Sequence, residues 1–352
     1  MTASRISLAV ETGTFPVPPA GRIAALRVRP DHDLSALPAE RLHVVQGFRP
    51  HFDALARRFD CAVAPEGPYA AALVAATRSK PQTLGLIATA LHLVPADAPI
   101  AVDGQKTDGI DSLLKTCKRA LGETAVVAKA HGKLFVLTRP AALPGAVADW
   151  ATAAAPTAGA DGAVTQAGVF SAGRLDAGSA LLAECLPQSL KGLVADLGAG
   201  WGALAPAVLA HPGVTGLDLV EGEHDALEAA RRNVSDARAR FLWEDVAGWR
   251  TGATYDWVIS NPPFHQGRAA DPGLGQAFIR TAAAVLRPGG RFLMVANRQL
   301  PYERTLAECF SELATLRETP AFKILQAGRP KSASRAGAGK PVSSPRGHKA
   351  GA

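Results

Sequence analysis

The sequence predicts an α/β protein made of two tandem Rossmann-like domains, the first of them degenerate. The chain has 352 residues, which suits two domains better than one. Strand-like and helix-like segments alternate in both halves, as they do in a parallel sheet covered by helices on both faces. Only the second half has a glycine-rich turn directly after a strand-like run.

The alternation is clearest in the second half. Short apolar runs predict strands at residues 193–197, 214–220, 239–243, 255–260 and 291–296. Helical spacing predicts helices at residues 204–210, 224–234, 275–286 and 302–310, and a turn is expected at residues 287–290.

The end of the second domain has a different pattern. Two strand-like runs, at residues 313–318 and 321–326, are separated only by Thr319 and Pro320. So short a connection predicts an antiparallel hairpin. A parallel sheet closed by a hairpin favours a methyltransferase over a dinucleotide dehydrogenase.

The first half gives weaker signals. Strands are expected at residues 42–46, 61–64, 100–103, 125–129 and 133–138, and helices at residues 50–59 and 109–121. The nearest candidate for a nucleotide loop, residues 64–67, has a single glycine. We therefore expect this half to be a degenerate copy that binds no nucleotide.

Composition divides the chain into four parts. Residues 140–163 are rich in Ala, Pro and Gly and predict a linker with one short helix near residues 146–153. The N-terminal domain is then residues 1–139 and the ligand-binding domain residues 164–327. Residues 328–352 are rich in Gly, Ala, Ser and Lys/Arg and are expected to be a disordered basic tail.

The net charge of +7 lies almost entirely in this tail. The tail has six basic and no acidic residues, which leaves 32 basic and 31 acidic residues in the rest of the chain. Composition alone therefore does not indicate RNA binding, and any RNA-binding face must be a local patch together with the tail.

Several classes of protein are excluded by composition. The four cysteines form no CxxC motif or Cys/His cluster, so we expect reduced thiols and no metal site. No apolar run is long enough to span a membrane, and the first ten residues lack the pattern of a signal peptide. We expect a cytoplasmic protein.

The glycine-rich turn follows the first predicted strand of the second domain. It comprises Asp196, Gly198, Gly200 and Gly202. Glycines let a backbone approach a ligand, and the next helix offers free N–H groups at its start. Glu221 ends the following strand, where a carboxylate can accept bonds from both ribose hydroxyls, and Asp218 is a rival for this role. These features indicate an adenosine nucleoside, either NAD or S-adenosylmethionine.

Asp245 and Val246 end the third strand of this domain. The carboxylate can accept from an adenine amino group while the Val246 N–H reaches a ring nitrogen. A helix N-cap is the alternative interpretation of Asp245.

The motif that separates the two cofactors is Asn261-Pro262-Pro263-Phe264, directly after the fourth strand. An amine on an aromatic ring is a poor nucleophile because its lone pair is delocalised. The Asn261 side-chain carbonyl and the Pro262 backbone carbonyl can accept both amine hydrogens and aim the lone pair at a sulfonium methyl group. Phe264 offers a face on which a planar base can stack, and His265 can contact that base. The motif predicts S-adenosylmethionine and a planar amine acceptor.

Four segments resemble one known family. They are residues 168–179, 261–267, 295–303 and 322–327. All four are similar to the bacterial rRNA guanine-N2 methyltransferases of the RsmC type. The resemblance spans residues 168–327 and implies two tandem methyltransferase-like domains, of which the C-terminal one binds S-adenosylmethionine and catalyses.

The resemblance also implies roles for particular residues. Those lining the cofactor site would be Asp176, Gly178, Asp196, Gly198, Gly200, Gly202, Glu221 and Asp245. The guanine amine would be held by Asn261 to Phe264, and the substrate side would be shaped by Asn297, Arg298 and Tyr302. The partner would be ribosomal RNA or a ribosomal subunit, with the target base flipped out of its stack. We expect the small-subunit 16S rRNA as substrate and a monomeric enzyme.

Two other functions stay open on the sequence alone. The Asn-Pro-Pro-Phe turn can also orient a guanine amine of 23S rRNA, adenine N6 or a protein glutamine amide. A non-catalytic RNA-binding assembly factor on a methyltransferase fold is the alternative from a different class. The intact glycine loop and Asn261 argue against it.

Overall fold

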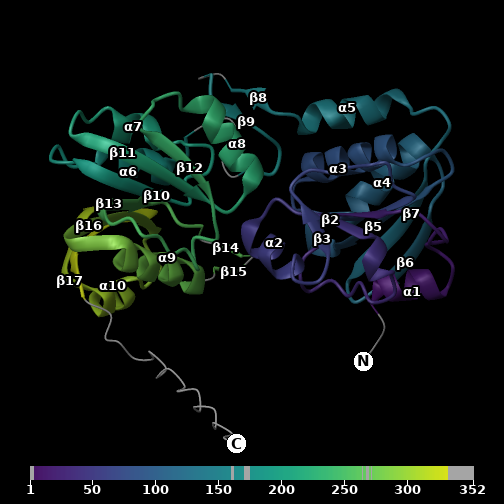
Figure 1. Ribbon diagram of the computed structural model, residues 1–352, viewed down its shortest axis with the longest axis horizontal. Coiled ribbons are helices and arrows are strands. Elements are labelled where there is room, and N and C mark those ends of the chain that lie inside the picture. Colours follow the sequence, from purple (N-terminus) through teal and green to yellow (C-terminus); the bar gives the residue numbers. More distant parts are fainter. Residues whose placement is uncertain are drawn as a thin grey trace, which may run out of the picture.

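The computed structural model describes residues 4–159, 162–169, 175–263, 265–266, 269–270 and 272–331. Figure 1 shows two α/β units side by side, the first in purple to blue and the second in teal to yellow. None of the helices in these described ranges is both long and apolar enough to cross a membrane.

The first unit is built on a seven-stranded sheet of order β3-β2-β1-β4-β5-β7-β6. Its strands are β1 Ile23–Leu26, β2 Leu42–Val45, β3 Asp60–Ala62, β4 Ala71–Ala75, β5 Pro99–Gln105, β6 Ala125–Lys129 and β7 Gly132–Thr138. Its helices are α1 Arg5–Glu11, η1 Ala39–Arg41, α2 Arg49–Leu55, α3 Lys80–Leu93, η2 Lys106–Asp108, α4 Ile110–Leu121 and α5 Gly145–Ala154. The first five strands are parallel, and β6 and β7 form an antiparallel hairpin at one edge.

The second unit repeats this plan in the order β12-β11-β10-β13-β16-β18-β17. Its strands are β10 Gly192–Leu197, β11 Val214–Glu221, β12 Ala239–Trp243, β13 Tyr255–Ser260, β16 Leu286–Asn297, β17 Phe310–Glu318 and β18 Phe322–Pro330. Its helices are α6 Ala177–Glu184, α7 Ala205–Leu209, α8 His224–Asn233, α9 Pro272–Val285 and α10 Glu303–Cys309. Two short strand pairs complete the structure, β8 Thr157–Ala158 with β9 Val164–Thr165, and β14 His265–Gln266 with β15 Ala269–Ala270.

The identical strand orders confirm the predicted duplication and the closing hairpin. In each sheet the seventh strand in the sequence lies between the fifth and the sixth and runs antiparallel to both. This arrangement leaves the carboxyl ends of the parallel strands together at one edge, where α/β sheets bind ligands.

Alternating side chains explain why each sheet is covered on both faces. In β1, Ala24 and Leu26 pack with α3 and α4, whereas Ile23 and Ala25 pack with α1. In the second sheet α9 and α10 cover one face and α6, α7 and α8 cover the other. The layers of apolar strands between two sets of helices are those of a doubly wound fold.

The structure corrects four details of the expected elements. β1 and β4 are absent from the predicted strands, as are the helices α1, α3 and α6. The segment 287–290, expected as a turn, belongs to β16, where the pairing with β13 is irregular. β18 extends to Pro330 and so includes three residues that were assigned to the tail.

The predicted short helix near residues 146–153 is α5, whose Val147 and Trp150 pack into the core of the first unit. The domain boundaries at residues 139 and 164 stay a prediction, and residues 332–352 of the tail lie outside the described residues.

Candidate active site

The candidate site lies at the carboxyl ends of β10, β11 and β13. Leu197, the last residue of β10, pairs with Val220 on one side and with Ser260 on the other. The residues that follow these three, Gly198, Glu221 and Asn261, therefore meet at one edge of the sheet. Ser260 Oγ donates to the Leu197 carbonyl at 2.7 Å and fixes this junction.

The glycine loop brings backbone N–H groups to Glu221. Gly198, Gly200 and Gly202 have φ angles of +76°, +57° and +83°, a region that favours glycine over any L side chain. Gly200 N donates to Glu221 Oε2 at 2.9 Å, and Glu223 N donates to Glu221 Oε1 at 2.7 Å. Burial raises the pKa of Glu221 despite these bonds. The carboxylate is thus oriented before any ligand binds.

Asp196 is a second buried acid at this edge. It is 1% exposed, and none of the residues that the structure describes bonds to either carboxyl oxygen. Burial, together with the nearby Glu221 charge, raises the pKa of Asp196 to about 8. A buried acid without donors fits a ligand that brings a positive charge or N–H groups to it.

Asp218, the rival for the ribose role, is engaged elsewhere. Both of its oxygens bind Arg240 at 2.6 Å, and the Tyr255 hydroxyl donates to it at 2.5 Å. It is fully buried, and these bonds tie it to β12 and β13 rather than to the glycine loop. Glu221 is therefore the acid that remains available at the end of β11.

Asp245 and Val246 follow β12, the outer strand on the same side. Asp245 Oδ1 accepts from Ala247 N at 3.0 Å, which is the local turn bond expected of a cap. The Val246 side chain is buried, and its carbonyl accepts from the Thr281 hydroxyl at 2.9 Å. These bonds hold the strand end in place beside Glu221.

Asn261 has a fixed amide orientation. Its Nδ2 donates to Ser179 Oγ at 2.8 Å and lies 3.3 and 3.4 Å from the two oxygens of Asp176. An ionised carboxylate only accepts hydrogen bonds, so the amide nitrogen, not the oxygen, faces Asp176. Asn261 Oδ1 is buried and has no hydrogen-bond partner among the described residues. The Asn261 side chain therefore presents an oriented acceptor at the end of β13.

Asp176 and Gly178 begin α6, which supports Asn261. Asp176 Oδ1 accepts from the backbone N–H groups of Gly178 and Ser179 at 2.9 and 3.1 Å, as an N-cap does. Ser179 was not among the expected site residues. It lies in the segment 168–179 that carries the family resemblance, but its contact with Asn261 spans 82 positions and leaves no local signal.

The residues expected on the substrate side differ from one another in position and exposure. Asn297 ends β16 and Arg298 is exposed just beyond it, with its backbone N–H bound to the Ala321 carbonyl. Tyr302 is fully buried in the core, and a Cβ on Gly275 would touch its hydroxyl. The side chain thus packs beside Gly275 of α9, and a part for Tyr302 on the substrate side stays a prediction. Phe264 lies outside the described residues, and His265 is described only as backbone in β14.

The equivalent edge of the first domain has lost each of these features. Leu26 pairs with Val45 and Val74, as Leu197 does with Val220 and Ser260, so Arg27 stands where the second domain has Gly198. By the same register Gln46 replaces Glu221, and Ala75 replaces Asn261. This supports the expectation that the first domain binds no nucleotide.

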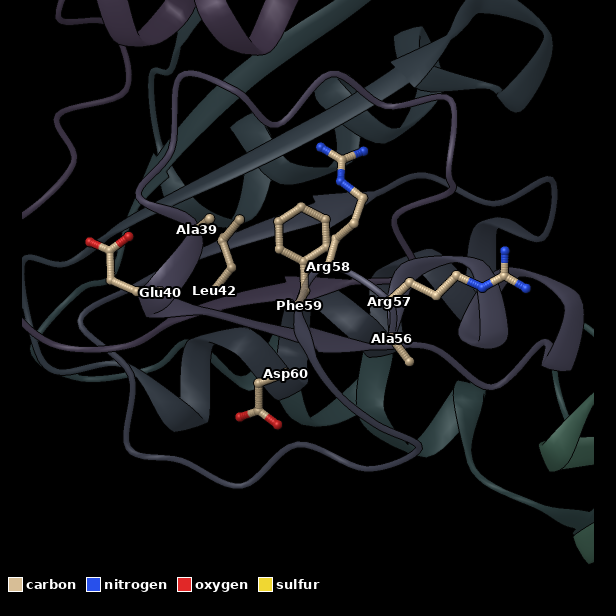
Figure 2. Close-up of a pocket in the computed structure, with 8 residues that line it drawn as sticks. All are labelled: Ala39, Glu40, Leu42, Ala56, Arg57, Arg58, Phe59 and Asp60. Atoms are coloured by element: carbon tan, nitrogen blue, oxygen red, sulfur yellow. The ribbon is translucent and has the colours of Figure 1, made fainter. Parts of the chain in front are cut away.

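A hollow of about 340 Å³ lies elsewhere in the first domain, at the amino ends of β2 and β3. Figure 2 shows the charged groups of Glu40, Arg57, Arg58 and Asp60 diverging around its rim. They share no common focus, and ligands of α/β sheets bind at the opposite edge. This hollow is not the candidate site.

Among the residues that the structure describes, no three His, Cys, Asp or Glu side chains gather closely enough to hold a metal ion.

A parallel sheet closed by an antiparallel hairpin, with a ligand loop after its first strand, defines a methyltransferase fold. The family model described as "Methyltransferase small domain" matches residues 162–326.

Comparison with individual proteins narrows the class to one family. A ribosomal RNA small subunit methyltransferase C from Shewanella sp. (strain MR-4) is 31% identical over 244 residues, which are 67% of this chain and 70% of that protein. The chain therefore belongs to the ribosomal RNA small subunit methyltransferase C family. A relative of the same name from Chromohalobacter salexigens is 42% identical over 168 residues, 46% of this chain and 49% of that protein. In this match and others like it the chain spans about half the length of the relative.

A solved structure agrees with this family. The 16S rRNA N2 methyltransferase (RsmC) of T. thermophilus, in complex with AdoMet and guanosine, matches with a TM-score of 0.76 and 26% sequence identity. The match covers 93% of this chain and 92% of that chain, so it includes both domains.

Proposed function

We propose that this protein transfers a methyl group from S-adenosylmethionine to the exocyclic N2 amine of a guanine in 16S rRNA. The observation that carries the proposal is Asn261 Oδ1, a buried acceptor at the end of β13 that has no partner in the part of the chain that the structure describes. A planar NH2 group supplies the donor that this oxygen needs. The T. thermophilus relative, whose complex contains AdoMet and guanosine, supports guanine as the base.

Asn261 and Pro262 would position the amine. The Asn261 side-chain oxygen and the Pro262 backbone oxygen accept its two hydrogens, and Pro262 and Pro263 stiffen the turn by fixing φ. Held in this way, the nitrogen lone pair points away from the acceptors. Neither carbonyl is a base strong enough to keep a proton, so the amine proton passes to water once the new N–C bond has formed.

The cofactor would lie along the strand ends from Asp196 to Asp245. Asp196 would accept from its cationic end, Glu221 from the ribose hydroxyls and Asp245 from the adenine amine. Gly198, Gly200 and Gly202 would let the backbone come close to it. When bound, S-adenosylmethionine supplies an electrophilic methyl group on a sulfonium centre. The residues present fit that group for two reasons. Among the described residues no group donates a hydrogen bond to the Asp196 carboxyl oxygens, and the Glu221 carboxylate is already held by the N–H groups of Gly200 and Glu223.

Deletion of the gene tests the assignment to 16S rRNA. Nucleoside mapping of ribosomal RNA should show one N2-methylguanosine missing from the small-subunit RNA, and the plasmid-borne gene should restore it. A guanine methylation profile that does not change on deletion would remove 16S rRNA as the substrate.

A further inference from the structure

The two domains are joined through the same loop of each fold. The β2–α2 loop of the first domain lies against the β11–α8 loop of the second, where Phe48 and Glu223 form an antiparallel bridge. Arg49 N donates to the Gly222 carbonyl and His224 N donates to the Gly47 carbonyl, both at 2.8 Å. In Figure 1, α2 accordingly lies on the side of the first unit that faces the second. The reciprocal bonds relate the two domains by an approximate twofold axis.

The loop contributed by the second domain is the one that begins with Glu221. Glu223 binds Glu221 through its backbone N–H at 2.7 Å, and its carboxylate pairs with Arg27 of the first domain at 2.9 and 2.7 Å. The Arg27 and Glu223 side chains are only 15% and 19% exposed. A Cβ on Gly47 would lie 2.8 Å from Arg27 Nη1 and 2.9 Å from Glu223 Oε1, so a larger residue there would displace this ion pair. Glu223 therefore connects Arg27 directly to the proposed ribose acid.

A second connection reaches the end of β12. Arg49 Nη1 donates to the Trp243 carbonyl at 2.7 Å, and its guanidinium lies 5.0 Å from the centre of the Trp243 ring. Trp243 Nε1 donates to the carbonyls of Gly47 and Gly222, at 3.0 and 2.9 Å. Asp245, the proposed adenine acceptor, is two residues further on. Arg49 thus holds the strand end that leads to it.

We propose that Arg27 and Arg49 are positioning residues for the adenosine half of the cofactor site. Neither side chain contacts the cofactor; each holds a loop that does. The first domain lacks the features of a nucleotide site. Arg27 occupies the position in this domain that corresponds to Gly198 in the second domain. A loop that is already ordered loses less conformational entropy when a ligand binds. Cofactor affinity therefore depends on the docked first domain.

The test is the dissociation constant of S-adenosylhomocysteine for the full-length protein, measured by calorimetry. Arg27→Ala and Arg49→Ala should each weaken binding about tenfold, within the usual range for coupling between separate sites. Arg22→Ala is the matched control. Arg22 precedes β1 at its amino end and pairs with exposed Asp60, whereas Arg27 follows β1 at its carboxyl end. The control should bind as the wild type does.

Two further measurements separate positioning from a loss of folding. The Arg27→Gln, Glu223→Gln double variant removes both charges and leaves neither buried alone. It should also bind about tenfold more weakly. Hydrogen exchange without any cofactor should be faster at the amides of Gly200 and Glu223 in this variant than in the wild type.

The proposal rests on the proposed cofactor site, and its failure can be told apart from a failure of that function. A wild-type protein that does not bind S-adenosylhomocysteine contradicts the proposed function. The positioning role alone is overturned if the wild type binds S-adenosylhomocysteine, the Arg27 and Arg49 variants bind it with the wild-type affinity, and hydrogen exchange in the double variant equals that of the wild type.

Discussion

At the scale of single residues, the chemistry depends on a few polar atoms that the folded chain leaves without partners. Within the described ranges, Asn261 Oδ1 and both oxygens of Asp196 are buried and unpaired, although most buried polar groups in proteins are satisfied. Such exceptions point to a ligand. The types of these two residues and their places, Asp196 near the end of one strand and Asn261 directly after another, could be predicted from the sequence, but their unpaired state could not.

The Asn261 carbonyl gives the first prediction. Asn261→Ala removes the acceptor that holds the amine and should lower the rate of methyl transfer about 100-fold or more, as loss of one oriented polar group from an active site does. Single-turnover transfer of labelled methyl groups measures this. Cofactor affinity serves as the internal control and should stay within about twofold, because Asn261 acts on the substrate amine. Equal transfer rates would contradict the role.

Ser179 gives a related prediction. Ser179→Ala removes the oxygen that accepts from Asn261 Nδ2 at 2.8 Å but leaves Asp176 beside the amide. The amide should be less firmly oriented, and we expect a loss of about tenfold in transfer rate, equal to ~1.4 kcal/mol. The same single-turnover assay applies, and Ser179→Thr, which keeps a hydroxyl, should recover most of the rate. A Thr variant as slow as the Ala variant would argue that the hydroxyl is irrelevant.

Asp196 predicts a pH dependence of stability. Its folded pKa, about 8, lies above the unfolded value near 3.9, so the folded state holds a proton that the unfolded chain has lost between these two values. The stabilising contribution is complete below about pH 4 and is lost as pH rises through about 8, with a slope of at most ~1.4 kcal/mol per pH unit. Urea unfolding of the cofactor-free protein at pH 5 to 8 should show this slope in the wild type and a smaller one in Asp196→Asn. Parallel pH profiles would contradict it.

At the scale of elements, the sequence predicted a segment accurately where the pattern of apolar and polar residues in that segment is clear. β12 and β13 agree with prediction at both ends because apolar runs are bounded by polar or turn residues. β1 and β4 were not predicted because Ile23–Leu26 and Ala71–Ala75 are rich in alanine, which has little preference for strands. Their strand conformation comes from burial between two helix layers, which is a tertiary effect.

The glycine loop yields a prediction about stability. A Cβ at Gly202 would lie 3.0 Å from Val234 and 3.4 Å from Ala230 on α8, whereas a Cβ at Gly200 meets nothing within 4 Å. Both positions have positive φ, so both Ala variants carry backbone strain of roughly 1–2 kcal/mol. Gly202→Ala should be the less stable because it also displaces α8. Thermal unfolding compares the two, and a less stable Gly200→Ala would show that packing against α8 does not matter.

At the scale of the whole molecule, the two copies of the duplicated fold differ in the features that they contain. The second domain contains the candidate site, and the first contributes a loop that docks against it and has Arg27 and Gln46 in the places of Gly198 and Glu221. The duplication could be predicted from the two alternating patterns. The docking could not, because Arg27 and Glu223 are 196 residues apart and neither belongs to a recognisable motif.

Trp243 tests the docked arrangement. Trp243→Phe keeps the ring beside Arg49 but removes the N–H that serves the carbonyls of Gly47 and Gly222. Each carbonyl keeps its backbone donor, His224 N for Gly47 and Arg49 N for Gly222, so the loss of the indole bonds should lower the free energy of unfolding by about 0.5–1.5 kcal/mol. Denaturant titration measures the change. A Phe variant as stable as the wild type would mean that water replaces the indole at the domain junction.

The central claim, a guanine-N2 methyltransferase of 16S rRNA, is tested most directly by product analysis. Purified enzyme and its Asn261→Ala variant are incubated with labelled S-adenosylmethionine and, separately, with 16S rRNA, small subunits, 23S rRNA, DNA and ribosomal protein, followed by digestion to nucleosides or amino acids. The predicted result is label in N2-methylguanosine from 16S rRNA or the small subunit, with the wild type only. Label in adenine N6, in a glutamine amide or in 23S rRNA, or none in any substrate, would contradict the claim.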